Sequence, residues 1–537
     1  MQLNNSGLMD TASFQRAGYR LPSFDRKAMT EKTLEAPAWI HFGAGNIFRA
    51  FQANLMQSLL DEGLSDTGLI VAEGFDYEIV KKMYRPHDDL SILVTLKADG
   101  QIEKTVIGSI ARSLILDSND LPEYEELKKI FRSPSLQMAS FTITEKGYSL
   151  VDGKGQLLPS VEKDFSKGSA QPESYIGKLT SLVYERFSAG KLPLALVSMD
   201  NCSHNGSKLY EAVHSFAKRW CENGLADPAF LSYLEDPASV SFPWSMIDKI
   251  TPRPDPKVEA LLMADGIEDL SPVITGKSTY VAPFVNAEEC EYLVIEDLFP
   301  NGRPPLEKAG VIFTDRETVN KVEKMKVCTC LNPLHTALAI FGCLLGYTLI
   351  SEEMKNPVLK ALVEKIGYQE GLPVVVDPGI IRPADFLAEV LNVRIPNPFM
   401  PDTPQRIATD TSQKLPIRFG ETIKAYEASD TLQVSDLVLI PLVFAGWLRY
   451  LMGIDDLGRP FEKSPDPLLD TLTPYVEGFS LGHVADVKER LQPLLKRSDI
   501  FGVDLYECGL AEKVLLHFEE MTAQPGAVAK TLEKYTN

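Results

Sequence analysis

Cysteine is scarce in this sequence, with 7 residues in a chain of 537, and their odd number and wide scatter exclude a disulfide framework. Reduced thiols of this kind favour a cytoplasmic protein. Long apolar runs are missing too, since even residues 437–451 form a run too short and interrupted to cross a bilayer. Residues 1–6 lack the basic start and apolar core of a signal peptide. We therefore expect a cytoplasmic protein with no membrane partner.

Positive charge is also in short supply, because 54 Lys and Arg residues face 74 Asp and Glu residues. The resulting net charge of -20 and the pI near 4.9 disfavour polyanions, so nucleic acid is not an expected partner. We find neither internal repeats nor low-complexity tracts. What the chain does have is length, since 537 residues are ample for two or three domains.

The periodicity of the apolar residues changes once along the chain. In the first part, short apolar runs alternate with helical stretches, as in a doubly wound sheet; these runs are residues 69–72, 93–96, 138–143 and 194–199. Later, apolar residues recur three and four apart, as in helices, at residues 336–350, 356–366, 384–391, 434–451 and 484–495. The pattern predicts an α/β plus all-α protein: a Rossmann-like doubly wound domain at 1–315, followed by a mainly helical domain at 316–537.

A glycine-containing turn follows the first apolar run, residues 38–42, and we expect a helix from residue 48 to 60 after it. Strand, glycine turn and helix form the context of a dinucleotide fingerprint, in which glycines let the backbone approach a pyrophosphate at the helix N-terminus. Phe48 takes the place of the third glycine, so the fingerprint is incomplete. The candidate cofactor-binding residues of this loop are Gly43, Gly45, Asn46 and Arg49.

Two carboxylates follow the next apolar run, residues 69–72. Glu73 ends that run, Asp76 comes close behind, and no Arg lies beside them. A carboxylate at this point accepts hydrogen bonds from the ribose 2′-hydroxyl and repels a 2′-phosphate, which favours NAD over NADP. The alternative is an acidic loop after a buried strand, and between the two residues Glu73 is slightly preferred.

A base, a carboxamide and an imidazole lie within ten residues in the middle of the chain, as Lys326, Asn332 and His335. Oxidising a secondary alcohol needs a group that accepts the hydroxyl proton, and a partly buried lysine is such a base near neutral pH. Asn332 can donate to the oxygen as it gains alkoxide character, and His335 can orient the substrate. Taken singly, each residue also has a structural interpretation, as a solvated lysine, a helix cap and a core histidine.

A zinc site is the competing interpretation of this stretch, because Cys328, Cys330 and His335 supply three potential ligands. Cys-x-Cys is not a common structural zinc spacing, and no second close pair of cysteines exists. Buried, inert cysteines are favoured instead, and no metal is expected.

Six separate segments, in the right order, resemble the mannitol dehydrogenase family of polyol-specific long-chain dehydrogenases. They are the glycine loop and residues 144–148, 200–201, 245–252, 294–297 and 326–335. Within that family, residues 407–416 most resemble the fructuronate reductase, or D-mannonate oxidoreductase, branch. The resemblance implies a zinc-independent, NAD-linked interconversion of a keto sugar and a polyol or aldonate. It also implies that the first domain binds NAD and the second carries substrate-binding and catalytic residues.

The resemblance also implies roles for single residues. Lys326 is the general acid/base, Asn201 and Asn332 hold the reacting oxygen, and His335 orients the substrate. Residues with supporting roles are Glu323 as a proton relay, Glu145 as a cofactor contact, and Arg394, Asp248 and Lys414 as substrate contacts.

The spacing from lysine to asparagine departs from the family pattern, which usually has four intervening residues where this chain has five. On one unbroken helix, with about 100° per residue, His335 lies about 180° from Lys326. Asn332 as N-cap followed by Pro333 is a favourable helix start. We therefore expect a break or bulge between Lys326 and Asn332.

The expected function is the reversible NAD-dependent oxidation of D-mannonate to D-fructuronate, so the partner is a small sugar acid or polyol. Mannitol 2-dehydrogenase and tagaturonate reductase are the alternatives. A hexuronate carries a carboxylate that needs a cation, and Arg394, Lys414 and Lys249 are the candidates. A different class is a catalytically silent NAD or sugar-acid sensor, which would keep the glycine loop but tolerate loss of Lys326.

Overall fold

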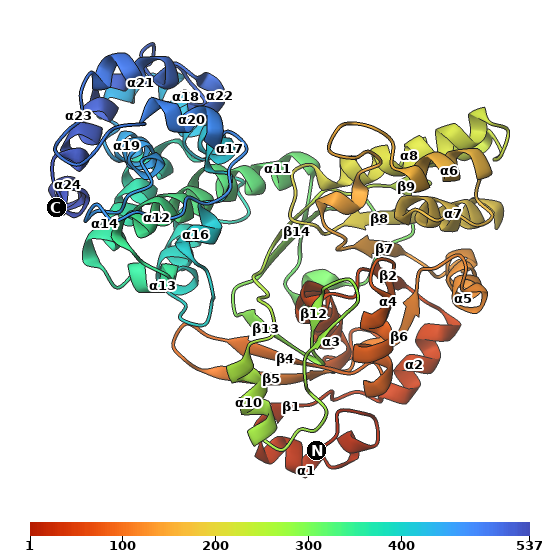
Figure 1. Cartoon of the computed structure of the whole chain (residues 1–537). Coiled ribbons are helices and arrows are strands. Elements are labelled where there is room, and N and C mark those ends of the chain that lie inside the picture. The colour runs from red at the N-terminus through yellow and green to blue at the C-terminus, as the bar shows by residue number, and fades with distance from the viewer. The chain divides into compact units, whose positions relative to one another are not determined.

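A computed structural model describes the whole chain, residues 1–537, as two compact units (Figure 1). Unit 1 comprises residues 1–320 and unit 2 comprises residues 321–537. The division lies inside helix α11 (Arg316–Met325), slightly later than the boundary expected from the sequence between residues 315 and 316.

The main sheet of unit 1 has six parallel strands in the order β6-β3-β2-β7-β8-β9. Their bounds are β2 (Trp39–Phe42), β3 (Leu69–Glu73), β6 (Ile110–Ile115), β7 (Met138–Phe141), β8 (Leu194–Ser198) and β9 (Val240–Ser241). The strand order reverses between β2 and β7, and the carboxyl ends of these two strands form the switch point at which such sheets bind ligands. The predicted doubly wound sheet is confirmed.

Helices cover both faces of this sheet. Successive strand residues point to opposite sides, so apolar side chains lie on both faces and pack against these helices. Ile40 of β2 packs with α5 (Leu121–Arg132) and α7 (Tyr175–Ser188) in one core. Trp39, its neighbour in the chain, packs with α3 (Ala53–Asp61) in the other core. The strands are therefore apolar on both faces, as is typical of a parallel sheet.

A second sheet in unit 1 has the order β1-β5-β4-β13, and its strands are β1 (Tyr19–Arg20), β5 (Ile102–Ile107), β4 (Ser91–Leu96) and β13 (Phe284–Glu288). The apolar run 93–96 lies in β4, so the prediction that placed it in the doubly wound sheet is wrong. β4 and β5 form an antiparallel hairpin, whereas strands of a parallel sheet need longer crossover connections. Smaller sheets contain β10 (Ser245–Asp248), β14 (Tyr292–Glu296) and β15 (Ile312–Thr314), and β11 (Val273–Ile274) and β12 (Tyr280–Val281).

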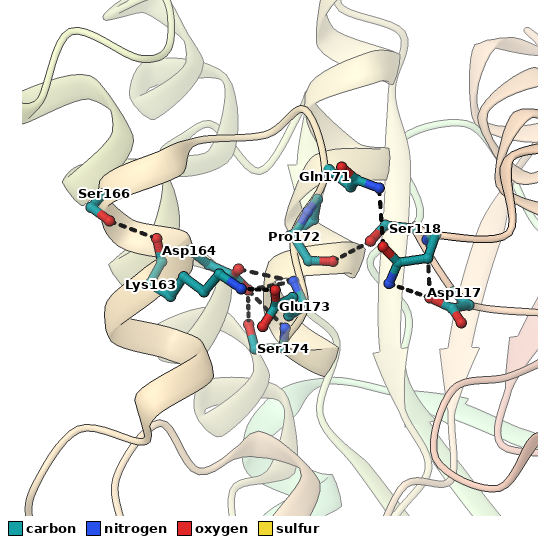
Figure 2. A network of polar contacts seen from close by, with 10 residues as sticks. Asp117, Ser118, Lys163, Asp164, Ser166, Gln171, Pro172, Glu173 and Ser174 are labelled. Carbon is teal, nitrogen blue, oxygen red and sulfur yellow. Dashed lines mark hydrogen bonds and ion pairs between the residues drawn. The ribbon is translucent and has the colours of Figure 1, made fainter.

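A polar network holds the connection between α6 (Pro159–Lys167) and α7 (Figure 2). The buried carboxylate of Asp164 accepts hydrogen bonds from the backbone N–H of Glu173 and from the N–H and hydroxyl of Ser174. Ser174 in turn caps α7, because its hydroxyl accepts a hydrogen bond from the N–H of Gly177. The network thus fixes the start of a helix that covers one face of the main sheet.

Unit 2 is helical, as predicted. Every residue of α19 (Leu439–Leu451) is buried, which agrees with the continuous apolar composition of that helix. The other helices of eight residues or more are α12 (Asn332–Leu345), α14 (Pro357–Lys365), α21 (Val487–Leu495), α23 (Ala511–Thr522) and α24 (Ala527–Thr536). The predicted helix at 384–391 is α15 (Pro383–Glu389).

One helical stretch, Arg316–Leu345, is long and apolar enough to cross a membrane by composition alone. However, 78% of its apolar window is buried inside the protein, and the core helix of a soluble protein passes the same compositional test. The stretch is a buried core helix.

Six helical segments contain π-helical turns, in which i→i+5 hydrogen bonding accommodates an extra residue. They are η2 (Phe48–Gln52), η3 (Val80–Tyr84), η7 (Lys326–Cys330), η8 (Ile366–Gly371), η10 (Val390–Arg394) and η11 (Pro416–Gly420). Turns of this kind are frequent at functional sites. Four of the six carry a cationic side chain of interest, namely Arg49, Lys326, Arg394 and Arg418.

Candidate functional site

The glycine loop lies at the switch point of the main sheet, directly after β2. Gly43 has a φ of 108°, and a Cβ added to it would lie 2.2 Å from the carbonyl oxygen of Thr142. No side chain fits there. A Cβ added to Gly45 meets nothing within 4 Å, so the loop has open space beside this residue. A glycine-lined approach of this kind is what a pyrophosphate requires.

A buried histidine holds the segment after β7 against this loop. The ring nitrogens of His41 lie 2.7 Å from the Ser140 hydroxyl and 2.8 Å from the Thr142 hydroxyl. Burial lowers the pKa of His41 to about 3, so the ring is neutral at physiological pH. Sequence reasoning missed this residue, because nothing in the apolar run 38–42 distinguishes a bracing histidine from a core one.

Phe48 stands where the fingerprint has its third glycine, and it packs differently from a glycine. Its buried ring stacks on the ring of His41, with centroids 4.5 Å apart. The third glycine normally allows close packing of helix on strand. Here the first helical turn after the loop is the wider π-turn η2, which accommodates the aromatic side chain.

Arg49 places a buried cation behind the glycine loop. Its guanidinium donates hydrogen bonds to the side-chain oxygen of Asn46 at 2.9 Å and to the carbonyl of Ala282 at 2.6 Å, whereas its Nε has no partner. No carboxylate pairs with it, and burial lowers the pKa of the guanidinium. A desolvated, unneutralised cation beside an open glycine loop fits an anionic group such as a dinucleotide pyrophosphate.

Glu73 and Asp76 are both buried and both already accept hydrogen bonds. The Glu73 carboxylate accepts the backbone N–H groups of Ala44, Phe75 and Asp76, at 2.7 to 3.0 Å. Burial raises the pKa of Glu73, and these hydrogen bonds oppose that rise. The Asp76 carboxylate accepts the hydroxyl of Thr275 at 2.5 Å. Glu73 thus ties the loop after β2 to the loop after β3, and its predicted contact with a ribose stays a prediction.

Asp200 organises the loops that follow β7 and β8. Its carboxylate accepts the N–H groups of Ile143 and Thr144 at 3.0 and 2.8 Å, and the hydroxyl of Tyr148 at 2.5 Å. Asn201, the next residue, is exposed at the carboxyl end of β8. Asp200 was quoted in the sequence only as part of a family segment, and its bracing role follows from these contacts.

The remaining predicted residues of unit 1 lie on several different elements. Glu145 is exposed and pairs with Lys208, and both residues line a surface cavity of about 410 Å³. Asp248 is buried at the end of β10. Lys249 forms an ion pair with Glu291 at 2.7 Å, so its charge is already compensated.

In unit 2, the chain bulges between Lys326 and Asn332, as expected. Lys326 is buried and begins the π-turn η7, in which the N–H of Leu331 donates to the carbonyl of Lys326 at 3.1 Å. The expectation that Asn332 is the N-cap is wrong by one residue, because Leu331 takes that place and Asn332 starts α12. Leu331 has the irregular backbone angles of a helix junction, φ -129° and ψ -63°.

The π-turn has a simple geometric consequence. Together with the irregular backbone of Leu331, it interrupts the regular α-helical turn between Lys326 and His335. The angle of about 180° that one unbroken helix would impose on these two side chains therefore does not apply.

The cysteines of this stretch do not form a zinc site with His335. No group of three or more His, Cys, Asp or Glu side chains is placed to hold a metal ion anywhere in residues 1–537. The Cys330 thiol is buried and donates to the carbonyl of Pro383 at 3.8 Å. Burial raises the pKa of Cys330 to about 12 and that of Cys328 to about 11, so both are protonated, inert thiols.

Arg394, Lys414 and Glu323 lie on three different elements of the helical part. Arg394 is buried at the end of the π-turn η10, and Glu323 precedes Lys326 by one turn on α11. The Lys414 ammonium donates to the carbonyls of Ile407 and Thr409 at 3.0 and 2.5 Å. Burial lowers the pKa of Lys414 to about 8. Lys414 is thus largely engaged by its own loop.

Arg418 is a cation that sequence reasoning missed. It lies on the π-turn η11, which packs against η7, the turn that carries Lys326. Its Nη1 donates to the Thr336 hydroxyl at 2.5 Å and approaches the Asn332 carbonyl at 3.5 Å. The available signal was its position four residues after Lys414, which places both cations on one side of a helix.

Comparison with known protein families matches both parts of the chain. Residues 37–308 match the family model described as the mannitol dehydrogenase Rossmann domain. Residues 318–522 match the one described as the mannitol dehydrogenase C-terminal domain.

Two curated relatives and two solved structures illustrate these matches. A D-mannonate oxidoreductase from Thermotoga maritima is 54% identical over 99% of both chains. A mannitol 2-dehydrogenase from Pyrenophora tritici-repentis is 30% identical over 92% of this chain and 81% of its own. The Pseudomonas fluorescens mannitol 2-dehydrogenase ternary complex with NAD and D-mannitol is 27% identical, covers 100% of this chain and 99% of its own, and superposes with a TM-score of 0.69. A substrate-free D-sorbitol dehydrogenase is 25% identical, covers 97% and 99%, and superposes with a TM-score of 0.78.

Proposed function

We propose, from the premise that this chain belongs to the mannitol dehydrogenase family, that it catalyses the reversible NAD-dependent oxidation of D-mannonate to D-fructuronate. The chain is an oxidoreductase that acts on CH–OH groups. The observation that carries the choice of substrate is the 54% identity to a D-mannonate oxidoreductase over 99% of both chains. A small sugar acid is therefore the proposed substrate, and a cytoplasmic location is proposed with it.

The proposed chemistry couples the loss of a hydroxyl proton to the transfer of a hydride from the carbon that bears this hydroxyl. The amine of Lys326 accepts the hydroxyl proton of D-mannonate, and Asn332 and Asn201 donate hydrogen bonds to the oxygen as it becomes a carbonyl. His335 orients the substrate. NAD supplies the hydride acceptor for this oxidation. Glu323 passes the proton from Lys326 to solvent, so that the amine can accept another proton in the next turnover.

In this proposal, the first domain binds the cofactor and the second domain supplies most of the substrate-binding groups. Gly43, Gly45, Asn46 and Arg49 form the pyrophosphate cradle. Residues proposed to complete the cofactor and substrate sites are Glu73, Asp76, Glu145, Asp248, Arg394 and Lys414. The support for the cradle is the open space at Gly45 and the unneutralised cation of Arg49 behind it.

A substrate panel tests the proposal. Oxidation of NADH is measured with D-fructuronate, D-tagaturonate and D-fructose as alternative substrates. We expect the highest kcat/KM with D-fructuronate, and we expect Lys326→Met to lower kcat by roughly 100-fold or more, because a positioned general acid/base contributes that much. NADH binding by this variant, followed by fluorescence, should be retained.

The panel also separates the alternatives. A preference for D-fructose would identify a mannitol 2-dehydrogenase, and a preference for D-tagaturonate would identify a tagaturonate reductase. NADH binding without turnover of any of the three ketoses would contradict the enzyme and support the silent sensor.

A further inference from the structure

Arg418 differs from three other arginines of unit 2 in how its charge is compensated. Arg406, Arg459 and Arg497 each form an ion pair with a carboxylate, from Asp402, Asp455 and Asp499 respectively. Arg418 contacts no carboxylate, and only the Thr336 hydroxyl and the Asn332 carbonyl accept from it.

Arg449 shows what a purely structural buried arginine looks like in this unit. Three of its guanidinium nitrogens donate, to the carbonyls of Met521, Ile454 and Asp455. A guanidinium has five N–H donors, and the two contacts of Arg418 both come from one nitrogen, Nη1. Its Nη2 and Nε, the edge that binds a carboxylate with two parallel hydrogen bonds, are not used by the protein.

The surroundings of Arg418 leave its charge without local compensation. Burial lowers the pKa of the guanidinium to about 10, and no neighbouring carboxylate opposes that effect. Lys414 lies near enough that the charge of Arg418 is the second cause, after burial, of the lowered pKa of the Lys414 ammonium. Two neighbouring cations without an ion-pair partner are costly unless an anion joins them.

Arg418 is also placed beside the proposed catalytic stretch. Its turn η11 packs against η7, and its side chain is anchored to Thr336 in the first turn of α12, which begins at Asn332. The N-terminus of this 14-residue helix adds a partial positive charge at the same place. An anion that bridges Nη2 and Nε would therefore lie near the start of α12, where Asn332 is proposed to hold the reacting oxygen.

We propose that Arg418 binds the carboxylate of the sugar-acid substrate, and that it is the residue by which this chain selects hexuronates over neutral ketoses. The inference rests on the proposed function, because it assigns the substrate charge to a residue of the same site. Lys414, engaged by two backbone carbonyls, supports Arg418 through its charge rather than as the main ligand. Thr336 is a positioning residue, since it holds Nη1, whereas the other edge of the guanidinium has no hydrogen-bond partner in the protein.

The test compares D-fructuronate with D-fructose, which carries a CH₂OH group in place of the carboxylate. With Arg418→Gln, we expect KM for D-fructuronate to rise about 10- to 100-fold, the equivalent of losing charged hydrogen bonds, while kcat/KM for D-fructose changes less than about threefold. Arg418→Lys keeps the positive charge but loses the two parallel N–H donors of the guanidinium. Its KM for D-fructuronate should therefore lie between those of the wild type and Arg418→Gln. Arg497→Gln removes an equally charged side chain that is paired with Asp499, and its kinetics should match the wild type.

Two failures remain distinguishable in this experiment. If the wild type prefers D-fructose, the proposed function is wrong, whatever Arg418 does. If the wild type prefers D-fructuronate but Arg418→Gln lowers kcat for both ketoses equally, Arg418 only supports α12 and the inference is overturned. Should Arg418→Gln fail to fold, as judged by its Tm, the comparison of Arg418→Lys with the wild type decides, and unchanged selectivity overturns the inference.

Discussion

At the scale of single residues, the informative feature is which cations the fold leaves without a carboxylate. Lys249 pairs with Glu291, so a carboxylate of unit 1 already compensates its charge. Arg49 and Arg418 are partly or fully buried, and neither has a carboxylate partner. Because burying an unpaired charge is costly, a site that keeps one is poised for an anionic ligand. The pyrophosphate and the substrate carboxylate are the two anions that the proposed reaction requires.

The two loop glycines make a matched pair for a residue-scale prediction. Gly43→Ala should destabilise the protein by roughly 2 kcal/mol or more, because its φ is 108° and the new Cβ would lie 2.2 Å from the Thr142 carbonyl. Gly45→Ala has open space around the new Cβ and should keep the wild-type Tm to within a few degrees. It should nevertheless raise the Kd for NADH about tenfold or more, since the methyl group would occupy the approach of the pyrophosphate.

The measurements are thermal unfolding and NADH fluorescence titration of both variants. Unchanged NADH affinity in a folded Gly45→Ala variant would contradict the assignment of this loop to the cofactor.

At the scale of elements, π-turns are the recurring device. The turns η2, η7, η10 and η11 carry Arg49, Lys326, Arg394 and Arg418. Each adds a wider turn with i→i+5 hydrogen bonds, which changes the angular positions of nearby side chains relative to a regular α-helix. At η7 this turn lies where the lysine-to-asparagine spacing has one residue more than the family pattern.

The contact between α12 and the short helix α13 (Ile350–Glu353) provides an element-scale prediction about pH. The Glu353 carboxyl group is fully buried against Gly342, neither of its oxygens has a hydrogen-bond partner, and burial raises its pKa to about 9. The folded protein therefore holds this proton up to about pH 9, whereas the unfolded chain releases it near the ordinary value of 4.5.

The sign of the effect follows from this difference. Between about pH 5 and 9 the folded state binds more protons, so this group lowers the free energy of unfolding by roughly 1.4 kcal/mol per pH unit as pH rises. Glu353→Gln should flatten that dependence and raise the stability at pH 8, as measured by urea unfolding at several pH values. Glu352→Gln changes the neighbouring residue, which pairs with Lys355, and should leave the slope as it is. A steeper slope in Glu353→Gln would contradict the prediction.

At the scale of the whole molecule, an acidic chain is proposed to act on acidic ligands. A net charge of -20 repels anions at long range, so NAD and a sugar acid must be held by local cations and N–H groups. The division into two compact units, with the glycine loop in unit 1 and Lys326 in unit 2, assigns these local sites to separate parts of the chain.

Cofactor choice can be measured on the whole molecule. At a concentration about 100 times its Kd, NADH should stabilise the protein by about 2.7 kcal/mol and raise its Tm. NADPH at the same concentration should raise the Tm much less, because the carboxylates of Glu73 and Asp76 after β3 repel a 2′-phosphate. An equal shift with both nucleotides would contradict the preference for NAD.

The sequence by itself determined the class of fold and the position of the glycine loop, and it singled out the stretch that is proposed to be catalytic. Apolar runs separated by turn residues predict parallel strands, apolar spacings of three and four predict helices, and the spacing from Lys326 to His335 predicts a bulge. These features can be predicted from the sequence because they depend on residues that are close together in the chain. One run, 93–96, was assigned to the wrong sheet, since its local pattern is the same in a hairpin as in a crossover unit.

Only the tertiary structure decided which charged groups are compensated and which are available. Arg49 reaches Ala282, 233 positions away, and Arg418 reaches Thr336, 82 positions away. Glu73, whose contact with a ribose stays a prediction, accepts three backbone N–H groups, one of them from the loop after β2. Such pairings arise when distant segments pack together and desolvate each other, and no local pattern of residues records them.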